Sequence, residues 1–310
     1  MIRFRLLVAA LAFALGAAAT AAAQTSTAAW AAGIGNDYRV AAGITYLTAS
    51  NWEAKLDVYT PRSQGPHPTV LHIHGGGWTG GTRESVILRA MPFLEMGFAV
   101  VNVSYRLARV AEAPAAVEDC LCALRWIVRN AKEYAFDVNR IVVTGYSAGG
   151  HLALTTGMIP QSAGLDRQCP GPEELKVAAI VNWYGITDVA DLLDGANVRS
   201  YAVQWLGSRT DRVEVARRLS PLTYVRRDLP PTLTIHGDAD PTVPYAHATR
   251  LHAALQKAGV TTELVTIPQG RHGNFPLPEQ VRAVEAMRAC LAKHGITRRP
   301  VATSAAGGQP

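Results

Sequence analysis

A serine in the middle of the chain has the surroundings that a catalytic nucleophile needs. Ser147 lies in the run Gly145-Tyr146-Ser147-Ala148-Gly149, after a strand-like stretch at 140–146 and before a helix-like stretch at 149–158. A serine hydroxyl is a poor nucleophile unless it projects from a sharp turn, and flanking glycines allow that turn to pack closely. The sequence therefore predicts Ser147 as the nucleophile of an acyl-transfer reaction.

A second glycine-rich segment, His74-Gly75-Gly76-Gly77-Trp78, follows the apolar run 69–74. Attack by Ser147 on an acyl carbon creates an oxyanion, and a glycine run lets backbone N–H groups approach it without obstruction by side chains. We expect these donors at Gly76 and Gly77, together with Ala148 at the start of the following helix. His74 precedes both the donors and the nucleophile, so it is interpreted as a structural residue of the loop.

The general base is expected after the nucleophile, in the loop that follows the last predicted strand. His272 lies there, in the segment 269–275, where flanking glycines allow an imidazole to reach Ser147. The other late histidines are interpreted as structural or solvated, and they are His236, His247, His252 and His294.

A carboxylate is needed to orient His272, and two candidates follow the preceding predicted strand. Asp238 and Asp240 both lie in the turn 236–244, and Asp188 is a more distant third candidate. A carboxylate in this turn would hold the tautomer of His272 and stabilise the imidazolium that forms during attack. Chain order alone leaves the choice between Asp238 and Asp240 open.

The elements that must position these residues alternate along the chain between short apolar runs and helical patterns. Strands are predicted at 38–48, 53–60, 69–74, 98–104, 140–146, 177–184, 231–237 and 262–267. Helices are predicted at 84–96, 113–134, 149–158, 247–258 and 278–294. This alternation predicts an α/β fold with a mostly parallel sheet of about eight strands, flanked by helices and edged by an antiparallel hairpin. The longer stretch 186–229 is predicted to form a small helical cap over the carboxyl ends of the strands.

The two ends of the chain differ from the part between them. Residues 1–23 carry Arg3 and Arg5, then an apolar run and small residues ending in Ala23, which predicts a signal peptide cleaved after Ala23 and a secreted or periplasmic protein. Residues 297–310 predict a disordered tail. Residues 24–296 are expected to form one compact domain, since 48% of the chain is hydrophobic and 17% charged. No later run is apolar for long enough to predict a further membrane span.

Charge and cysteine spacing argue against a nucleic-acid-binding protein and against a metal site. The formal charge of +6 is scattered, without the basic stripe or motif of a nucleic-acid-binding protein. The spacing of the cysteines is not that of a metal site, so no metal is expected. An oxidising compartment permits disulfides among Cys120, Cys122, Cys169 and Cys290. We expect no bond between Cys120 and Cys122, which face different sides of a predicted helix, and the pairing is otherwise open.

These motifs, in the order Ser147, Asp240, His272, resemble the α/β-hydrolase superfamily over nearly the whole mature chain. The segments 119–126, 182–188 and 236–244 are similar to those of bacterial esterases related to feruloyl and acetyl-xylan esterases. The resemblance favours Asp240 as the acid and leaves Asp238 to stabilise the turn. It also implies an acyl-enzyme mechanism without a cofactor and an acyl pocket lined by Trp78, Tyr146, Trp183 and Tyr184.

The resemblance implies a carboxylesterase that acts on small or soluble esters, because the sequence has no long hydrophobic lid. Acetyl or feruloyl esters of plant polysaccharides would suit an exported enzyme. Three alternatives remain open on the sequence: an amide hydrolase of the formamidase or peptidase type, an acyltransferase, and an inactive binding module with a hydrolase fold. Oligomeric state is also open.

Overall fold

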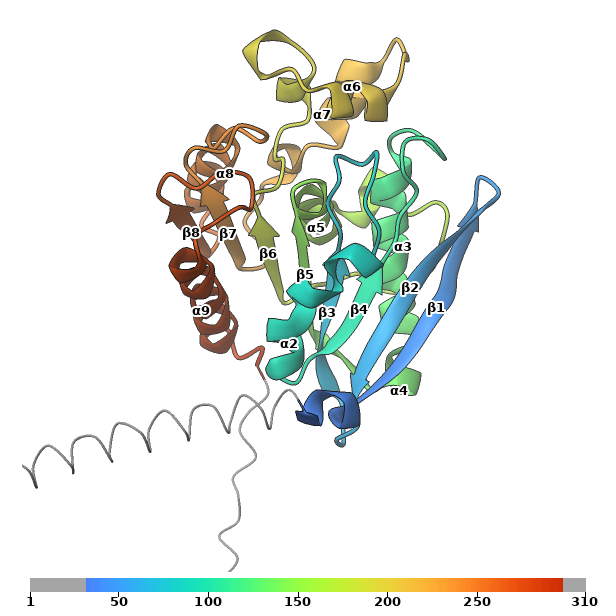
Figure 1. Cartoon of the computed structure of the whole chain (residues 1–310). Helices are drawn as coiled ribbons and strands as arrows, with labels where there is room; N and C mark the ends of the chain where they lie inside the picture. Colours follow the sequence, from blue (N-terminus) through green and yellow to red (C-terminus); the bar gives the residue numbers. More distant parts are fainter. Residues whose placement is uncertain (1–31, 298–310) are drawn as a thin grey trace, which may run out of the picture.

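Eight strands form one sheet in the order β1-β2-β4-β3-β5-β6-β7-β8 (Figure 1). The computed structural model describes residues 32–297, so the predicted signal peptide and almost all of the predicted tail lie outside it. The strands are β1 (Tyr38–Ala49), β2 (Trp52–Pro61), β3 (His67–Ile73), β4 (Ala99–Val103), β5 (Phe136–Tyr146), β6 (Ala179–Trp183), β7 (Thr232–Gly237) and β8 (Thr262–Ile267). Strand β2 is antiparallel to both neighbours, and the other adjacent pairs are parallel. The predicted fold class is confirmed.

The antiparallel edge of the sheet is a hairpin with a two-residue turn. Ser50 and Asn51 both have positive φ, and Ala49 pairs with Trp52 across them. Two central residues of positive φ match the twist of the flanking strands, which favours this tight connection. The predicted edge hairpin is therefore present, with its link at the predicted place.

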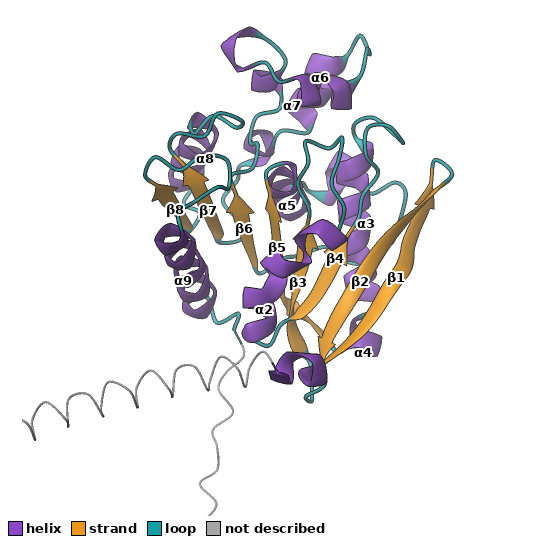
Figure 2. Ribbon diagram, viewed as in Figure 1, coloured by secondary structure: helices purple, strands orange, loops and turns teal. Residues whose placement is uncertain are grey.

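The central strands are buried on both faces, as their continuous apolar runs predicted. Every residue of β3, β4, β6 and β7 is buried. One face packs against α3 (Ala115–Arg129), α5 (Ala148–Met158) and α8 (Ala246–Lys257). The other face packs against α2 (Met91–Glu95) and α9 (Leu277–Lys293), so the molecule has three layers (Figure 2).

Two predicted helices are each divided in the structure. The predicted helix 84–96 consists of the 3₁₀ helix η1 (Glu84–Ala90) followed by α2, whose first turn contains Pro92. Proline has no backbone N–H to continue the preceding helix, and it fits the first turn of a new one. The predicted helix 113–134 consists of α3 and α4 (Ala131–Tyr134), separated at Asn130, whose side chain donates to the Trp126 carbonyl oxygen at 2.8 Å.

Strand β5 begins four residues before its predicted start. Phe136 pairs with His67 at the beginning of β3, which extends the ladder beyond the apolar run that gave the prediction. Local hydrophobicity does not reveal this pairing, because it depends on a partner far away in the sequence. The extension lies at the amino end of β5, away from Ser147.

Segment 186–229 lies above the carboxyl ends of the strands (Figure 1). It contains the 3₁₀ helices η3 (Ala190–Leu192), η4 (Gly195–Asn197) and η5 (Pro221–Tyr224) and the helices α6 (Ser200–Leu206) and α7 (Arg212–Arg218). We call residues 186–229 the cap segment. Its buried side chains include Trp205, Leu206 and Leu219, which belong to the same apolar cluster as α3 and α5.

A disulfide ties α3 to the loop that precedes β6. Cys122 bonds Cys169, while Cys120 and Cys290 are free and buried, so the expectation that Cys120 and Cys122 do not pair is confirmed. The same loop is held by Arg125, whose guanidinium is fully buried and donates to the Asp166 carboxylate at 2.5 Å. The 3₁₀ helix η2 (Gln161–Ala163) also lies in this loop.

Candidate active site

Ser147 occupies a strained turn between β5 and α5. Its φ is 57° and its ψ is −120°, a conformation that non-glycine residues rarely adopt. The turn needs glycine on both sides. A Cβ atom on Gly145 would lie 2.3 Å from the Gly149 carbonyl oxygen, and one on Gly149 would lie 2.3 Å from the Ile73 carbonyl oxygen. Backbone packing, and not only flexibility, therefore requires the two glycines of this motif.

His272 lies between Ser147 and Asp240. Its Nε2 is 2.8 Å from the Ser147 hydroxyl oxygen, and its Nδ1 is 2.7 Å from the Asp240 carboxylate oxygen Oδ2. A carboxylate only accepts hydrogen bonds, so Nδ1 carries the proton and Nε2 is free to accept from the hydroxyl. The structure thus brings together the three residues that the sequence singled out, which come from the ends of β5, β7 and β8.

Asp240 is held as an anion by donors on several sides. Its oxygen Oδ1 accepts from the backbone N–H groups of Thr242 at 2.8 Å and Val243 at 3.0 Å, and its side chain is fully buried. Burial alone would raise the pKa of the Asp240 carboxyl. Hydrogen bonds from His236 and His272 outweigh burial and hold this pKa well below its usual range.

The other two acidic candidates do not contact His272. Asp238 is exposed and accepts from the backbone N–H of Gln269 at 2.6 Å, so it joins the turn after β7 to the loop after β8. Asp188 pairs with Arg250 at 3.2 Å. The predicted role of Asp238 in stabilising the turn agrees with these contacts.

The predicted oxyanion donors lie around Ser147. Gly76 and Gly77 have φ of 117° and 59°, which suits glycine. Within the described chain, their backbone N–H groups donate to no protein acceptor. Ala148 is the first residue of α5, where an N–H has no partner inside the helix. These three groups are therefore available to an oxygen of the substrate.

His74 has a structural role in the glycine-rich loop that contains Gly76 and Gly77. Its ring stacks on Tyr105 with centroids 4.2 Å apart, and its Nδ1 lies 2.7 Å from the Gly75 carbonyl oxygen. Burial lowers the pKa of His74 to about 4, so the ring is neutral near pH 7. The structural interpretation of His74 is confirmed.

Ser147 opens into a cavity of about 450 Å³. Its lining contains Gly75, Gly76, Gly77, Gly81, Ser85, Val86, Arg89, Tyr146, Ser147, Tyr184, Tyr201, Thr242 and His272. Two of the four predicted pocket residues, Tyr146 and Tyr184, belong to this lining. Ser85, Val86 and Arg89 from η1, Tyr201 from the cap segment and Thr242 were not predicted, because none of them belongs to a recognisable catalytic motif.

Trp78 does not line this cavity, contrary to its prediction as a pocket residue, whereas Trp183 lies in the wall of an adjoining cavity. Trp78 is fully buried, stacks on Trp205 with centroids 4.1 Å apart, and donates from Nε1 to His151 Nδ1 at 3.2 Å. The chain turns at Trp78, where φ is 58°, and the indole packs beneath the cap segment. Trp183 lines a second cavity of about 340 Å³, which shares Arg89, Tyr146 and Tyr184 with the first.

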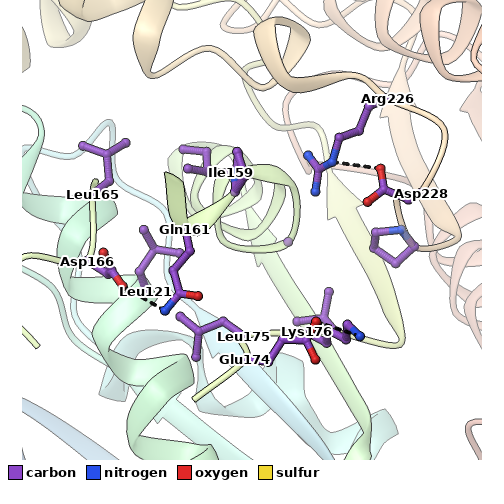
Figure 3. Close-up of a pocket in the computed structure, with 14 residues that line it drawn as sticks. Leu121, Ile159, Gln161, Leu165, Asp166, Glu174, Leu175, Lys176, Arg226 and Asp228 are labelled. Atoms are coloured by element: carbon purple, nitrogen blue, oxygen red, sulfur yellow. Dashed lines mark hydrogen bonds and ion pairs between the residues drawn. The ribbon is translucent and has the colours of Figure 1, made fainter. Parts of the chain in front are cut away.

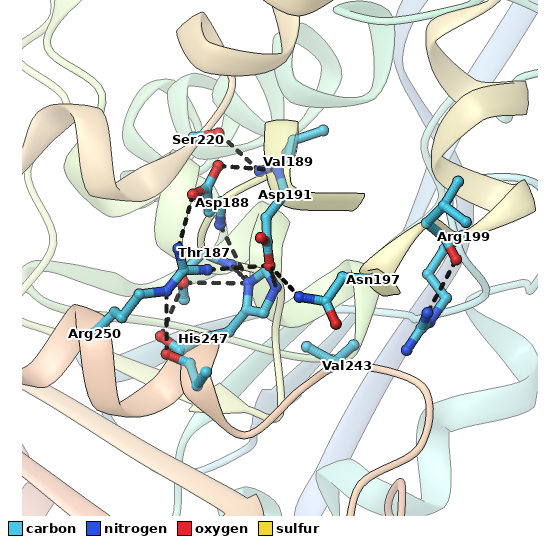
Figure 4. Close-up of polar contacts among 12 residues, drawn as sticks. Thr187, Asp188, Val189, Asp191, Asn197, Arg199, Ser220, Val243, His247 and Arg250 are labelled. Atoms are coloured by element: carbon cyan, nitrogen blue, oxygen red, sulfur yellow. Dashed lines mark hydrogen bonds and ion pairs between the residues drawn. The ribbon is translucent and has the colours of Figure 1, made fainter. Parts of the chain in front are cut away.

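Polar contacts fix the cap segment to α8 (Figure 4), and others fix it to the turn that carries Asp240. Asp191 lies 3.2 Å from both His247 and Arg250 of α8. Arg199 reaches the Asp240 turn, where it donates to the carbonyl oxygens of Thr242 at 2.9 Å and Pro241 at 3.1 Å. The turn that carries Asp240 is thus held partly by the cap segment.

Another cavity, of about 350 Å³, lies away from these residues (Figure 3). Its lining includes Ile159 after α5, Val177 before β6 and Pro230 before β7, together with the ion pair of Arg226 and Asp228. These positions mark the amino ends of the parallel strands, whereas ligands of open α/β sheets bind at the carboxyl ends. Ser147 and His272 do not reach this cavity.

Residues 32–297 hold no cluster of His, Cys, Asp and Glu arranged for a metal ion. Within the same range, no helix is both long and apolar enough to cross a membrane.

Strand order, the serine turn and the histidine after the last strand together define the α/β-hydrolase fold. A family model described as BD-FAE matches residues 56–255, and the chain belongs to this family.

Individual relatives agree with this assignment. Esterase LipQ of Mycobacterium tuberculosis is 30% identical over 226 residues, which cover 70% of this chain and 52% of LipQ. The chain spans about half the length of LipQ and of two further relatives from that organism. Ethyl acetate hydrolase of Pseudomonas putida is 28% identical over 247 residues, which cover 74% of this chain and 74% of that enzyme.

Among solved structures, the esterase Est2 of Thermogutta terrifontis is 26% identical, with a TM-score of 0.70 over 86% of this chain and 95% of Est2. Structures of Est2 have also been solved with propionate and with butyrate bound, and each is 26% identical with a TM-score of 0.69.

Proposed function

We propose that this protein is a serine carboxylesterase that hydrolyses small or soluble esters. The observation that carries the proposal is the continuous chain of hydrogen bonds from Ser147 through His272 to Asp240, at 2.8 and 2.7 Å. This arrangement matches the geometry by which an imidazole activates a serine hydroxyl.

The proposed reaction has two halves. In the first, Oγ of Ser147 attacks the ester carbonyl carbon while Nε2 of His272 takes the hydroxyl proton, and the imidazolium is stabilised by Asp240. The proton then passes to the leaving alcohol, and the acyl group stays on Ser147. In the second half, water attacks the acyl-serine while His272 takes its proton, and the acyl–oxygen bond then breaks as His272 returns that proton to Oγ of Ser147, which releases the acid. The N–H groups of Gly76, Gly77 and Ala148 bind the oxyanion in both halves.

The size and walls of the cavity support a short acyl group. A space of about 450 Å³, bounded by Tyr146, Tyr184 and Tyr201, suits a small ester. The relatives point the same way, since one is named ethyl acetate hydrolase and Est2 has been solved with propionate and butyrate. Acetyl esters of plant polysaccharides have such a short acyl group, and feruloyl esters are a second, bulkier class of polysaccharide ester. Export by the segment 1–23 would bring the enzyme to both.

The proposal is tested by hydrolysis of p-nitrophenyl esters from acetate to octanoate, beside methyl ferulate, acetylated xylan and N-formylkynurenine. Ser147→Ala serves as the control that measures uncatalysed turnover. We expect Ser147-dependent turnover that is greatest for the short esters. Turnover of the formamide alone would replace the esterase proposal with an amidase, and no turnover of any compound would favour a binding module.

A further inference from the structure

Arg89 is a cation at the junction of the two cavities beside Ser147. It lines the cavity that contains Ser147 and His272, and it also lines the second cavity of about 340 Å³. Beyond the shared residues, the walls of the second cavity contain the apolar side chains of Leu88, Pro92, Trp183, Phe275, Val284 and Met287, together with Gly273 and the polar Gln280.

Two aromatic side chains hold the guanidinium of Arg89 in place. Its Nη1 donates to the Tyr184 hydroxyl at 2.8 Å, and its central carbon lies 4.5 Å from the centroid of the Tyr146 ring. Tyr146 precedes the nucleophile in the chain, and the Tyr184 ring packs edge-on against the His272 ring at 4.7 Å. The guanidinium of Arg89 therefore contacts two side chains that are themselves neighbours of Ser147 and His272.

This guanidinium has no carboxylate partner among residues 32–297, and neither cavity has an aspartate or glutamate in its lining. Other arginines of the fold differ. Arg106 pairs with Asp119 at 2.6 Å, and Arg125 pairs with Asp166 and Glu173. Arginine has five N–H donors in a planar fork, and among residues 32–297 the Arg89 guanidinium donates to one side-chain oxygen, the hydroxyl of Tyr184. Arg89 is an exposed residue that lines both cavities, so the guanidinium donors that Tyr184 does not use are accessible to a group of the substrate.

We propose that Arg89 binds a carboxylate of the substrate, so that the preferred esters carry a negative charge close to the scissile bond. This inference rests on the proposed esterase function and names the substrate class. The planar fork matches a carboxylate with two parallel hydrogen bonds, and the contact strengthens when substrate excludes water from the cavity. The apolar side chains of the second cavity contact the hydrocarbon part that carries the carboxylate.

The test compares charged esters with neutral esters of the same shape. Mono-p-nitrophenyl adipate is paired with p-nitrophenyl 6-methylheptanoate, which places the charge in the acyl group. A second pair, 4-acetoxybenzoate and 4-isopropylphenyl acetate, places it in the alcohol. For each pair the ratio of kcat/KM, charged over neutral, is measured for the wild type, Arg89→Gln and Arg89→Lys, with rates for Ser147→Ala subtracted.

We expect the wild type to favour the charged member of at least one pair. Arg89→Gln should lower that ratio by about tenfold or more, chiefly through KM, because a charge-assisted hydrogen bond is lost. Arg89→Lys should retain part of the preference, since it keeps the charge without the fork. Added salt should weaken the preference in the wild type.

Arg109→Gln is the matched control. Arg109 is exposed on the loop between β4 and α3, and it lines neither cavity, so its loss makes the same change in net charge and should leave the ratio unchanged.

Two results would overturn the inference while leaving the esterase function intact. One is an active wild type without preference for either charged ester. The other is an equal loss on charged and neutral esters in Arg89→Gln, which would mean that Arg89 only supports Tyr146 and Tyr184. A wild type inactive on every ester would instead refute the proposed function itself.

Discussion

The carboxylate of Asp240 accepts a hydrogen bond from Nδ1 of His272 at 2.7 Å, whereas Asp238, two residues earlier, accepts one from the backbone of Gln269. Two acidic residues of a single turn therefore have different partners. One orients the imidazole, and the other joins two loops.

Asp240→Asn should lower kcat by about 10³-fold to 10⁴-fold, because an amide at this position no longer fixes the His272 tautomer or stabilises the imidazolium. Asp238→Asn should lower kcat by no more than about tenfold, since the Asp238 carboxylate accepts from the backbone N–H of Gln269 and does not contact His272. Steady-state kinetics on a short p-nitrophenyl ester measure both. Equal losses, or a larger loss for Asp238→Asn, would contradict the assignment of Asp240.

Arg199→Ala should lower kcat by about tenfold while the protein stays folded. The side chain of Arg199 holds the carbonyl oxygens of Pro241 and Thr242, so its removal frees the turn that positions Asp240. Arg212→Ala is the matched control, because Arg212 is an exposed arginine on α7 of the same cap segment. Thermal unfolding checks that both variants fold, and equal kcat values for them would refute the positioning role.

The protein should lose stability as the pH falls from about 6.5 to about 4. Burial lowers the pKa of five histidines to about 4, and they are His72, His74, His151, His247 and His252. In this range the unfolded chain binds protons that the folded chain does not, so the free energy of unfolding decreases as pH decreases. Urea unfolding at a series of pH values measures the slope. A flat profile between pH 7 and pH 5 would contradict the prediction.

Cys122→Ser should lower the free energy of unfolding by about 2–4 kcal/mol, because the crosslink between Cys122 and Cys169 restricts the unfolded chain. Cys120→Ser is the control in the same helix, since Cys120 forms no disulfide, and its cost should be smaller. Denaturant unfolding compares the two. Thiol titration of the unfolded wild type should find two free cysteines, and four would show that the bond does not form.

The architecture was predictable because hydrophobic periodicity reflects burial. Runs such as Val100 to Val103 and Ile141 to Val143 lie in strands buried on both faces, and their positions along the chain match those predicted. The residues of the candidate triad could be identified because Ser147 and His272 stand in short segments with glycines that the turns require.

The cavity walls could not be predicted in the same way. Arg89 and Tyr201 reach the cavity because of where η1 and the cap segment lie in the fold. No local sequence pattern predicts those positions. Trp78 was expected in the pocket from its place in the glycine loop, yet the positive φ at this residue turns the indole into the core. The pairing of Cys122 with Cys169 likewise depends on a loop that folds back over α3.

The most direct test of the central claim is intact mass spectrometry after exposure to a fluorophosphonate, which modifies activated serines. We expect one adduct per chain in the wild type, located on Ser147 by peptide mapping. Ser147→Ala should show none, and His272→Ala should show strongly slowed modification because the base is missing. Modification of Ser147→Ala at the wild-type rate, or no modification of the wild type, would contradict the assignment of Ser147 as the nucleophile.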